Sequence, residues 1–169
     1  MFCVDEYVVY GSEGVCKVES IGHPDISGLD ATKEYYTLLP VYHSGKIYTP
    51  TDSHIPMRNA ITKEKAHLLI DDLENVGFTL DVPRDAKQAA QYYKDLVRTY
   101  KCENLISIVK YVTKKQHKLS QIKKNLPAVD QKFLKIAQDM LCGELSFALD
   151  KDPQEVREKL DRCFRCCCE

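Results

Sequence analysis

The sequence predicts an α+β protein in which a small N-terminal β-barrel precedes an all-α bundle of about five helices. Two patterns support this. Before residue 61, short runs of aromatic and β-branched residues alternate with turn residues. After it, apolar residues recur at helical spacing. The 169 residues are 44% hydrophobic and 29% charged, which is an ordinary globular composition.

Four strands are expected in the N-terminal domain, residues 1–61. The first two, 7–10 and 15–21, flank a turn between Gly11 and Gly14, where positive φ is cheap for glycine. The third covers 34–42, and Pro40 places it at a sheet edge or a bulge because proline donates no ladder hydrogen bond. The fourth covers 46–50. Several short strands at this spacing are typical of a small barrel.

The helical domain is expected over residues 62–165. Thr62 can cap the first helix, Pro83 precedes the second, and Pro127 opens the fourth. Asp152 and Pro153 form a strong start signal for the fifth. The apolar stripes are narrow, so the helices should pack on one another as a bundle. Residues 166–169 are expected to be a frayed, cysteine-rich tail.

Several classes of site are disfavoured by the motifs. The turn from Gly11 to Gly14 leads into a strand, so no helix N-terminus faces a phosphate there. The five histidines form no known catalytic motif. We therefore expect no enzyme, no small-molecule substrate, no cofactor and no metal. The N-terminal residues lack the features of a signal peptide and no apolar run could span a bilayer, so a cytoplasmic protein is expected.

Eight cysteines are many for this length, and four crowd the end of the chain. Cys163 and Cys166 have CxxC spacing, but a zinc site usually needs a second such pair. In a reducing compartment the scattered cysteines should behave as small apolar residues. A thiol redox or metal protein remains a minor alternative.

Charge is strongly segregated along the chain. Residues 1–61 hold eight acids and four bases, a net charge of −4. Residues 104–129 hold no acid and six lysines: Lys110, Lys114, Lys115, Lys118, Lys123 and Lys124. Lys110, Lys114 and Lys118 are spaced i, i+4, so they share one helix face. An unopposed basic face suits the phosphate backbone of a nucleic acid, although an acidic protein surface would fit the charge as well.

The layout resembles the CarD/CdnL group of bacterial transcription regulators over nearly the whole chain, to about residue 162. The resemblance is carried by the order and spacing of several segments: 4–10, 13–15, 18–21, 34–38, 47–50 and 140–145. It implies a Tudor-like barrel, of the Tudor/SH3 type, that docks on the β subunit of RNA polymerase. It also implies a helical domain that contacts promoter double-stranded DNA and modulates the stability of the open complex.

The resemblance also assigns site residues. The expected polymerase-binding segment is Lys46, Ile47, Tyr48, Thr49 and Pro50. The expected DNA-binding residues are Ala89, Tyr92, Lys94, Arg98, Lys110, Lys114, Lys118, Lys123 and Lys124. Relatives often carry a tryptophan wedge where Ala89 stands, and this chain has no tryptophan. Tyr92 could substitute as the wedge. The rival interpretation is a protein-interaction adaptor whose basic patch meets an acidic partner.

Overall fold

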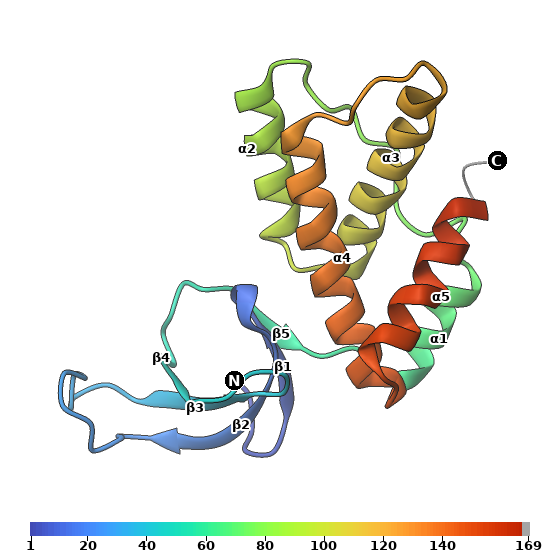
Figure 1. Cartoon of the computed structure of the whole chain (residues 1–169). Helices are drawn as coiled ribbons and strands as arrows, with labels where there is room; N and C mark the ends of the chain where they lie inside the picture. The colour runs from blue at the N-terminus through green and yellow to red at the C-terminus, as the bar shows by residue number, and fades with distance from the viewer. Residues whose placement is uncertain (167–169) are drawn as a thin grey trace. The chain divides into compact units, whose positions relative to one another are not determined.

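The computed structural model describes residues 1–166 and divides the chain into two compact units. The first runs from Met1 to Ala60 and is a β-sheet, and the second begins at Ile61 and is helical. Each unit has a hydrophobic core of its own. Figure 1 shows the sheet in blue to cyan and the helices in green to red. The predicted α+β class is confirmed.

The first unit is a five-stranded antiparallel sheet in the order β4-β3-β2-β1-β5. Its strands are β1 (Tyr7–Tyr10), β2 (Gly14–Gly22), β3 (Tyr35–Pro40), β4 (Ile47–Pro50) and β5 (Met57–Asn59). A short 3₁₀ turn, Gly11–Glu13, joins β1 to β2. The sequence did not predict β5. A register shift between Val18 and Ser20 bends β2 against β3.

The sheet core gathers on one face of the strands. Its buried members are Val8, Tyr10, Cys16, Val18, Tyr36 and Leu38. Val8 and Tyr10 are two residues apart on β1, and Cys16 and Val18 repeat that spacing on β2, as the period of a strand requires. Cys16 behaves as a small core residue. Burial, and secondarily the nearby Glu13 carboxylate, raises the pKa of its thiol to about 11.

The second unit contains five helices within the described residues. They are α1 (Lys63–Asp71), α2 (Ala86–Val97), α3 (Cys102–Gln121), α4 (Ala128–Leu149) and α5 (Pro153–Cys166). The central helix is α4, which packs against each of the other four. The predicted stripes form the core, and Ala66, Tyr93, Ile108, Leu141 and Leu160 are all at most 4% exposed.

Side-chain caps fix where α1, α2 and α5 begin. Thr62 accepts a hydrogen bond from the Lys65 N–H, and Asp152 accepts one from the Gln154 N–H. The cap of α2 is Asp85, two residues after Pro83. Cys166 is the last residue of α5, and the rest of the expected tail, residues 167–169, lies outside the described residues. Within residues 1–166, each helix is too short or too polar to span a bilayer.

Candidate functional site

Strand β4 is the last strand on its side of the sheet. It pairs with β3 along one side, with Tyr36 opposite Thr49 and Thr37 opposite Tyr48. On the other side no strand among residues 1–166 follows it. Such an edge offers a row of backbone N–H and C=O groups to an incoming strand. This places the expected polymerase-binding segment where β-augmentation is geometrically open.

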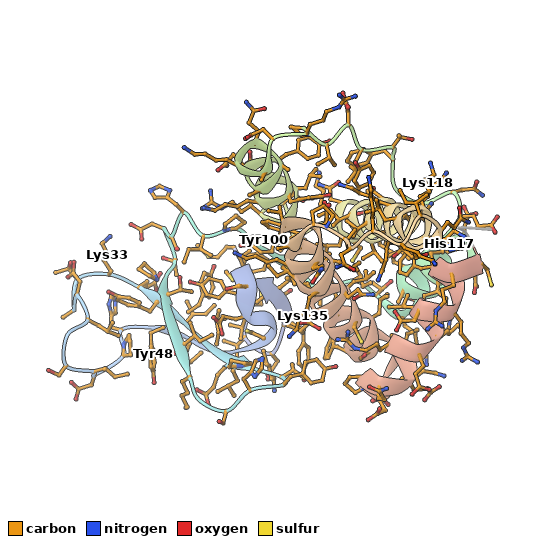
Figure 2. All side chains as sticks on the ribbon, turned by 45° about the horizontal axis from the view of Figure 1, so that its top comes forward. Lys33, Tyr48, Tyr100, His117, Lys118 and Lys135 are labelled. Atoms are coloured by element: carbon orange, nitrogen blue, oxygen red, sulfur yellow. The ribbon has the colours of Figure 1, made fainter. Side chains whose placement is uncertain are left out.

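The side chains of β4 divide between its two faces. Ile47 packs against the sheet core, and Thr49 is only 2% exposed. The Thr49 hydroxyl is fully buried and has no hydrogen-bond partner among the described residues. Tyr48 and Pro50 lie on the opposite face and are half-buried (Tyr48 is labelled in Figure 2). Of the expected contact residues, Thr49 could therefore meet a partner only through its backbone.

Lys46 lies in the turn before β4 and is exposed. Its ammonium is 2.5 Å from a carboxylate oxygen of Glu19. The hydrogen bond to Glu19 raises the pKa of Lys46 above its usual value. Because both side chains are exposed, this ion pair adds little to stability. The ion pair does hold the Lys46 side chain against β2. A partner that binds at β4 would therefore contact the Lys46–Glu19 ion pair and not an unpaired lysine.

In the second unit, α3 carries the predicted basic face. One of its lysines, Lys110, donates hydrogen bonds within the unit instead of pointing freely into solvent. The Lys110 ammonium donates hydrogen bonds to three backbone carbonyls, those of Leu73 at 3.0 Å, Glu74 at 2.6 Å and Val76 at 3.1 Å. These carbonyls follow the end of α1, where backbone acceptors have no helical partner. The Lys110 charge is thus engaged within the unit, which argues against the expected DNA contact of Lys110 without testing it.

Lys115 is also engaged within the unit. Its ammonium lies 2.6 Å from one oxygen of the buried Asp130 carboxylate, and the Tyr93 hydroxyl donates to the other oxygen at 2.6 Å. Burial, and secondarily the hydrogen bond to Asp130, raises the pKa of Tyr93 above its usual value. The three side chains tie α2, α3 and α4 together. A buried carboxylate needs such partners.

Four lysines of the basic stretch remain on the surface: Lys114, Lys118, Lys123 and Lys124. No carboxylate among residues 1–166 forms an ion pair with any of them. Figure 2 labels Lys118 beside His117, one residue earlier on α3. Lys114 lies one turn before Lys118 on the same face, and Lys123 and Lys124 continue into the connection to α4. We call these four residues the basic ridge.

The expected wedge position on α2 has a different environment. Ala89 is only 6% exposed and packs in the helical core, which argues against the expected DNA contact of its side chain without testing it. Tyr92 is half-buried, and its ring packs edge-on against Tyr93 with centroids 6.4 Å apart. Lys94 and Arg98 are exposed and share the face of α2 opposite Ala89.

One surface aromatic was missed by sequence reasoning. Phe78 lies in the connection between α1 and α2 and is 50% exposed. Its neighbourhood includes Tyr111 and Lys114 of α3, some thirty positions later in the chain. No local pattern could have signalled that these residues line the same hollow, because this depends on how the connection lies against α3.

Within residues 1–166, no cluster of metal-ligating side chains forms around the cysteines of the thiol or metal alternative. Cys163 is half-buried and Cys166 is exposed, both on α5. Among the described residues, no cluster of three or more histidine, cysteine or acidic side chains is arranged to hold a metal ion.

The fold and its open edge define a class of protein: a small β-sheet interaction module followed by a helical unit. Residues 2–61 match the family model of the CarD-like/TRCF RID domain. The first unit is therefore similar to the domain of this family, a similarity that supports an RNA polymerase-interacting protein. Over residues 2–61 this confirms the resemblance to CarD-like proteins, and it supports a transcription-related, polymerase-binding role. No curated protein matches the chain.

Proposed function

We propose that this protein regulates transcription by docking on the β subunit of RNA polymerase through β4 while the basic ridge holds promoter DNA and modulates the open complex. The observation that carries the proposal is the combination of an open sheet edge in a polymerase-interacting domain with the four surface lysines of the basic ridge on a separate helical unit.

The polymerase-binding part of the proposal is supported by the family match of residues 2–61 and by the open edge of β4. An edge strand gives affinity through main-chain hydrogen bonds, and outward side chains such as Tyr48 then add specificity. The net charge of −4 in residues 1–61 favours a basic partner surface and disfavours DNA. The protein contact and the DNA contact thus belong to different units.

The DNA-binding part of the proposal is supported by the basic ridge. Lys94 and Arg98 supply further positive charge on α2. Lysines that are exposed and unpaired can meet phosphates without first breaking an internal ion pair. Such contacts supply affinity without reading the sequence of the DNA. No base-reading side chain is needed if the polymerase positions the protein at the promoter.

The polymerase contact can be tested with a fragment of residues 1–61 and the isolated β subunit lobe. The fragment should be retained in a pull-down, and Tyr48→Ala should weaken binding by about 1 kcal/mol or more, as for an interface aromatic. Val4→Ala changes an apolar side chain that is 49% exposed in the same unit and serves as the matched control. Retention of the helical unit alone would refute the assignment of roles.

The DNA contact can be tested by replacing all four lysines of the basic ridge with alanine. The slope of log K against log salt should flatten by about 0.9 for each phosphate that the protein no longer neutralises. A control variant with alanine at Lys63, Lys87, Lys101 and Lys159 removes the same charge from other exposed positions. Equal slopes for the two variants would mean that the ridge faces solvent.

The adaptor interpretation predicts a different result. An adaptor should not bind random duplex DNA even at low salt, whereas the proposed regulator should show weak, salt-sensitive binding. Fluorescence anisotropy with a random duplex separates the two. Replacing Cys163 and Cys166 with alanine should leave binding intact, which tests the thiol alternative in the same assay without removing the buried Phe164.

A further inference from the structure

A hollow of about 340 Å³ lies within the first unit and is lined from both ends of the sheet. Two cross-strand pairs contribute to its wall. Tyr36 on β3 lies opposite Thr49 on β4, and Tyr10 on β1 lies opposite Met57 on β5. Because these pairs stand at opposite edges of the strand order, the sheet must curl to bring them to one hollow. The hollow is therefore the interior of an incompletely closed barrel.

Two further segments complete the wall of this hollow. Residues 51–56 connect β4 to β5, and Figure 1 shows this connection passing from one edge of the sheet to the other. The N-terminal segment contributes Phe2, whose N–H donates to the Tyr36 hydroxyl at 3.2 Å and whose ring packs edge-on against Tyr36. The mouths of β-barrels are common places for small-ligand sites, and the volume of this hollow falls in their usual range.

The wall of the hollow includes a buried hydroxyl group without a partner. The Thr49 hydroxyl oxygen is the single buried side-chain oxygen or nitrogen of residues 1–166 that forms no hydrogen bond. Thr49 shares its face of β4 with Ile47, which packs against the sheet core, so its side chain points inward. A change of χ1 rotamer can turn the hydroxyl without moving the backbone. A ligand in the hollow that forms a hydrogen bond with this group would recover the free energy that leaving it unpaired costs.

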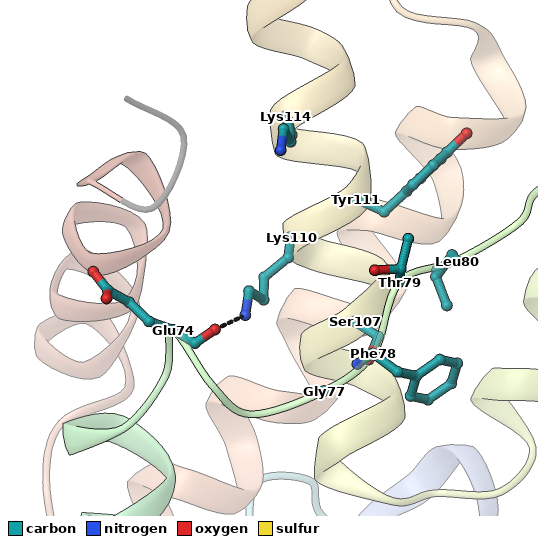
Figure 3. Close-up of a pocket in the computed structure, with 9 residues that line it drawn as sticks. All are labelled: Glu74, Gly77, Phe78, Thr79, Leu80, Ser107, Lys110, Tyr111 and Lys114. Atoms are coloured by element: carbon teal, nitrogen blue, oxygen red, sulfur yellow. Dashed lines mark hydrogen bonds between the residues drawn. The ribbon is translucent and has the colours of Figure 1, made fainter.

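A second hollow, of about 300 Å³, provides a contrast. It lies between α3 and the connection that joins α1 to α2 (Figure 3). Two of its polar side chains already have partners. The Lys110 ammonium donates to three backbone carbonyls, and Figure 3 draws the bond to Glu74. The Ser107 hydroxyl accepts from the Phe78 N–H and donates to the Glu103 carbonyl. The hollow of the first unit thus differs in having a buried polar group still to be satisfied.

The chemistry of the wall defines the class of ligand. Phe2, Tyr10 and Tyr36 contribute aromatic rings, and Met57 adds a thioether, which packs favourably against ring edges. Within residues 1–166, no aspartate, glutamate, lysine or arginine lines the hollow. A charged ligand would therefore lose its water without gaining an ion pair. A neutral aromatic ring suits this wall, and one N–H or O–H group on the ring can donate to the oxygen of Thr49.

We propose that this hollow binds a small, neutral aromatic molecule that carries one N–H or O–H group, with that group donating a hydrogen bond to the Thr49 hydroxyl. The site is separate from the proposed polymerase contact, which uses the backbone at the outer edge of β4, whereas the ligand meets an inward side chain of that strand. Because Thr49 belongs to β4, an occupied hollow would stabilise the strand on which the proposed docking depends.

The test uses the full chain, labelled with ¹⁵N, in NMR titrations with two probes of nearly equal shape, indole and indene. Indene has a CH₂ group where indole has its N–H, so it cannot donate the hydrogen bond. Both probes should bind and shift amide signals of residues lining the hollow. Thr49→Val should weaken indole binding by about threefold or more, the contribution of one neutral hydrogen bond, and leave indene binding unchanged. The readout is the ratio of the two dissociation constants, because the probes also differ in how readily they leave water.

Three further variants serve as controls. Thr49→Ser keeps the hydroxyl and should keep the wild-type ratio. Phe2→Ala removes a ring from the wall and should weaken both probes. Val4→Ala changes an apolar side chain that is 49% exposed in the same unit, and it should weaken neither probe.

Four outcomes would overturn the inference. The first is that neither probe binds the wild type. The second is that the shifted signals are confined to residues 62–166, and the third is that Thr49→Val weakens both probes equally. The fourth is that saturating indole displaces the isolated β subunit lobe from the full chain. The hollow would then hold a side chain of the polymerase and not a small molecule, while the proposed function would stand. Lobe binding that persists with indole bound is the expected result.

Discussion

At the level of single residues, Tyr93 carries much of the tie between α2 and α4. Its hydroxyl is 2.6 Å from Asp130 inside the core, and Asp130 also holds Lys115. Tyr93→Phe should lower the free energy of unfolding by about 1.5–3 kcal/mol, because a hydrogen bond to a charged group is lost inside the protein. Denaturant titration measures this. Tyr92→Phe, one residue earlier and half-buried, should change stability by less than about 0.5 kcal/mol.

The same hydroxyl gives the stability a dependence on alkaline pH. Burial and the Asp130 hydrogen bond raise the pKa of Tyr93 in the folded protein, whereas an unfolded tyrosine ionises near pH ~10. The contribution of Tyr93 is therefore complete below pH ~10 and is lost as the pH rises above it. Unfolding free energy measured across this range should fall more steeply for the wild type than for Tyr93→Phe. Parallel curves would contradict the assigned cause.

Thr49 is a second residue whose environment makes a sharp prediction. Its hydroxyl is buried in the edge strand β4 without a partner among the described residues. Thr49→Val keeps the shape and removes the unpaired group, so the unfolding free energy of residues 1–61 should rise by about 1 kcal/mol. Thr49→Ser keeps the hydroxyl and removes a methyl group, so it should be destabilising. A valine variant less stable than the wild type would show that the hydroxyl is satisfied in solution.

At the level of elements, α3 carries two lysines four residues apart with different roles. Lys110 donates hydrogen bonds within the unit, and Lys114 is exposed. Lys110→Met should cost about 1–3 kcal/mol of stability, since three carbonyls lose a charged donor, and should leave the salt dependence of DNA binding unchanged. Lys114→Met should change the free energy of unfolding little, because Lys114 is exposed. It should lower the slope of log K against log salt by about 0.9, because one phosphate contact is lost. Thermal unfolding and anisotropy on both variants measure this contrast.

The same two lysines show how far the sequence predicts the structure. Their i, i+4 spacing correctly places them on one face of a helix, just as Thr62 and Asp152 correctly predict where two helices begin. The acceptors of Lys110, however, are backbone carbonyls 34 to 37 positions away, which no local pattern reveals. Short β5 was missed for the same reason, because its three residues exist as a strand only through pairing with β1.

At the level of the whole molecule, charge separates the two units and sets how they should act together. The chain has a net charge of −1 and residues 1–61 carry −4, so the rest of the chain carries a net charge of +3. The sheet unit should therefore oppose binding to free DNA, and a fragment beginning at residue 62 should bind a random duplex more tightly than the full chain at low salt.

On a polymerase–promoter complex the full chain should instead bind more tightly than the fragment that begins at residue 62. Once β4 is docked, the basic ridge meets DNA at the effective concentration set by the tether, which multiplies the affinity without any new contact. The full chain should then outcompete the fragment from residue 62 by roughly a hundredfold or more. Competition titrations on duplex alone and on the assembled complex measure both orders. If the fragment binds better in both settings, the sheet unit does not deliver the helical unit to promoter DNA.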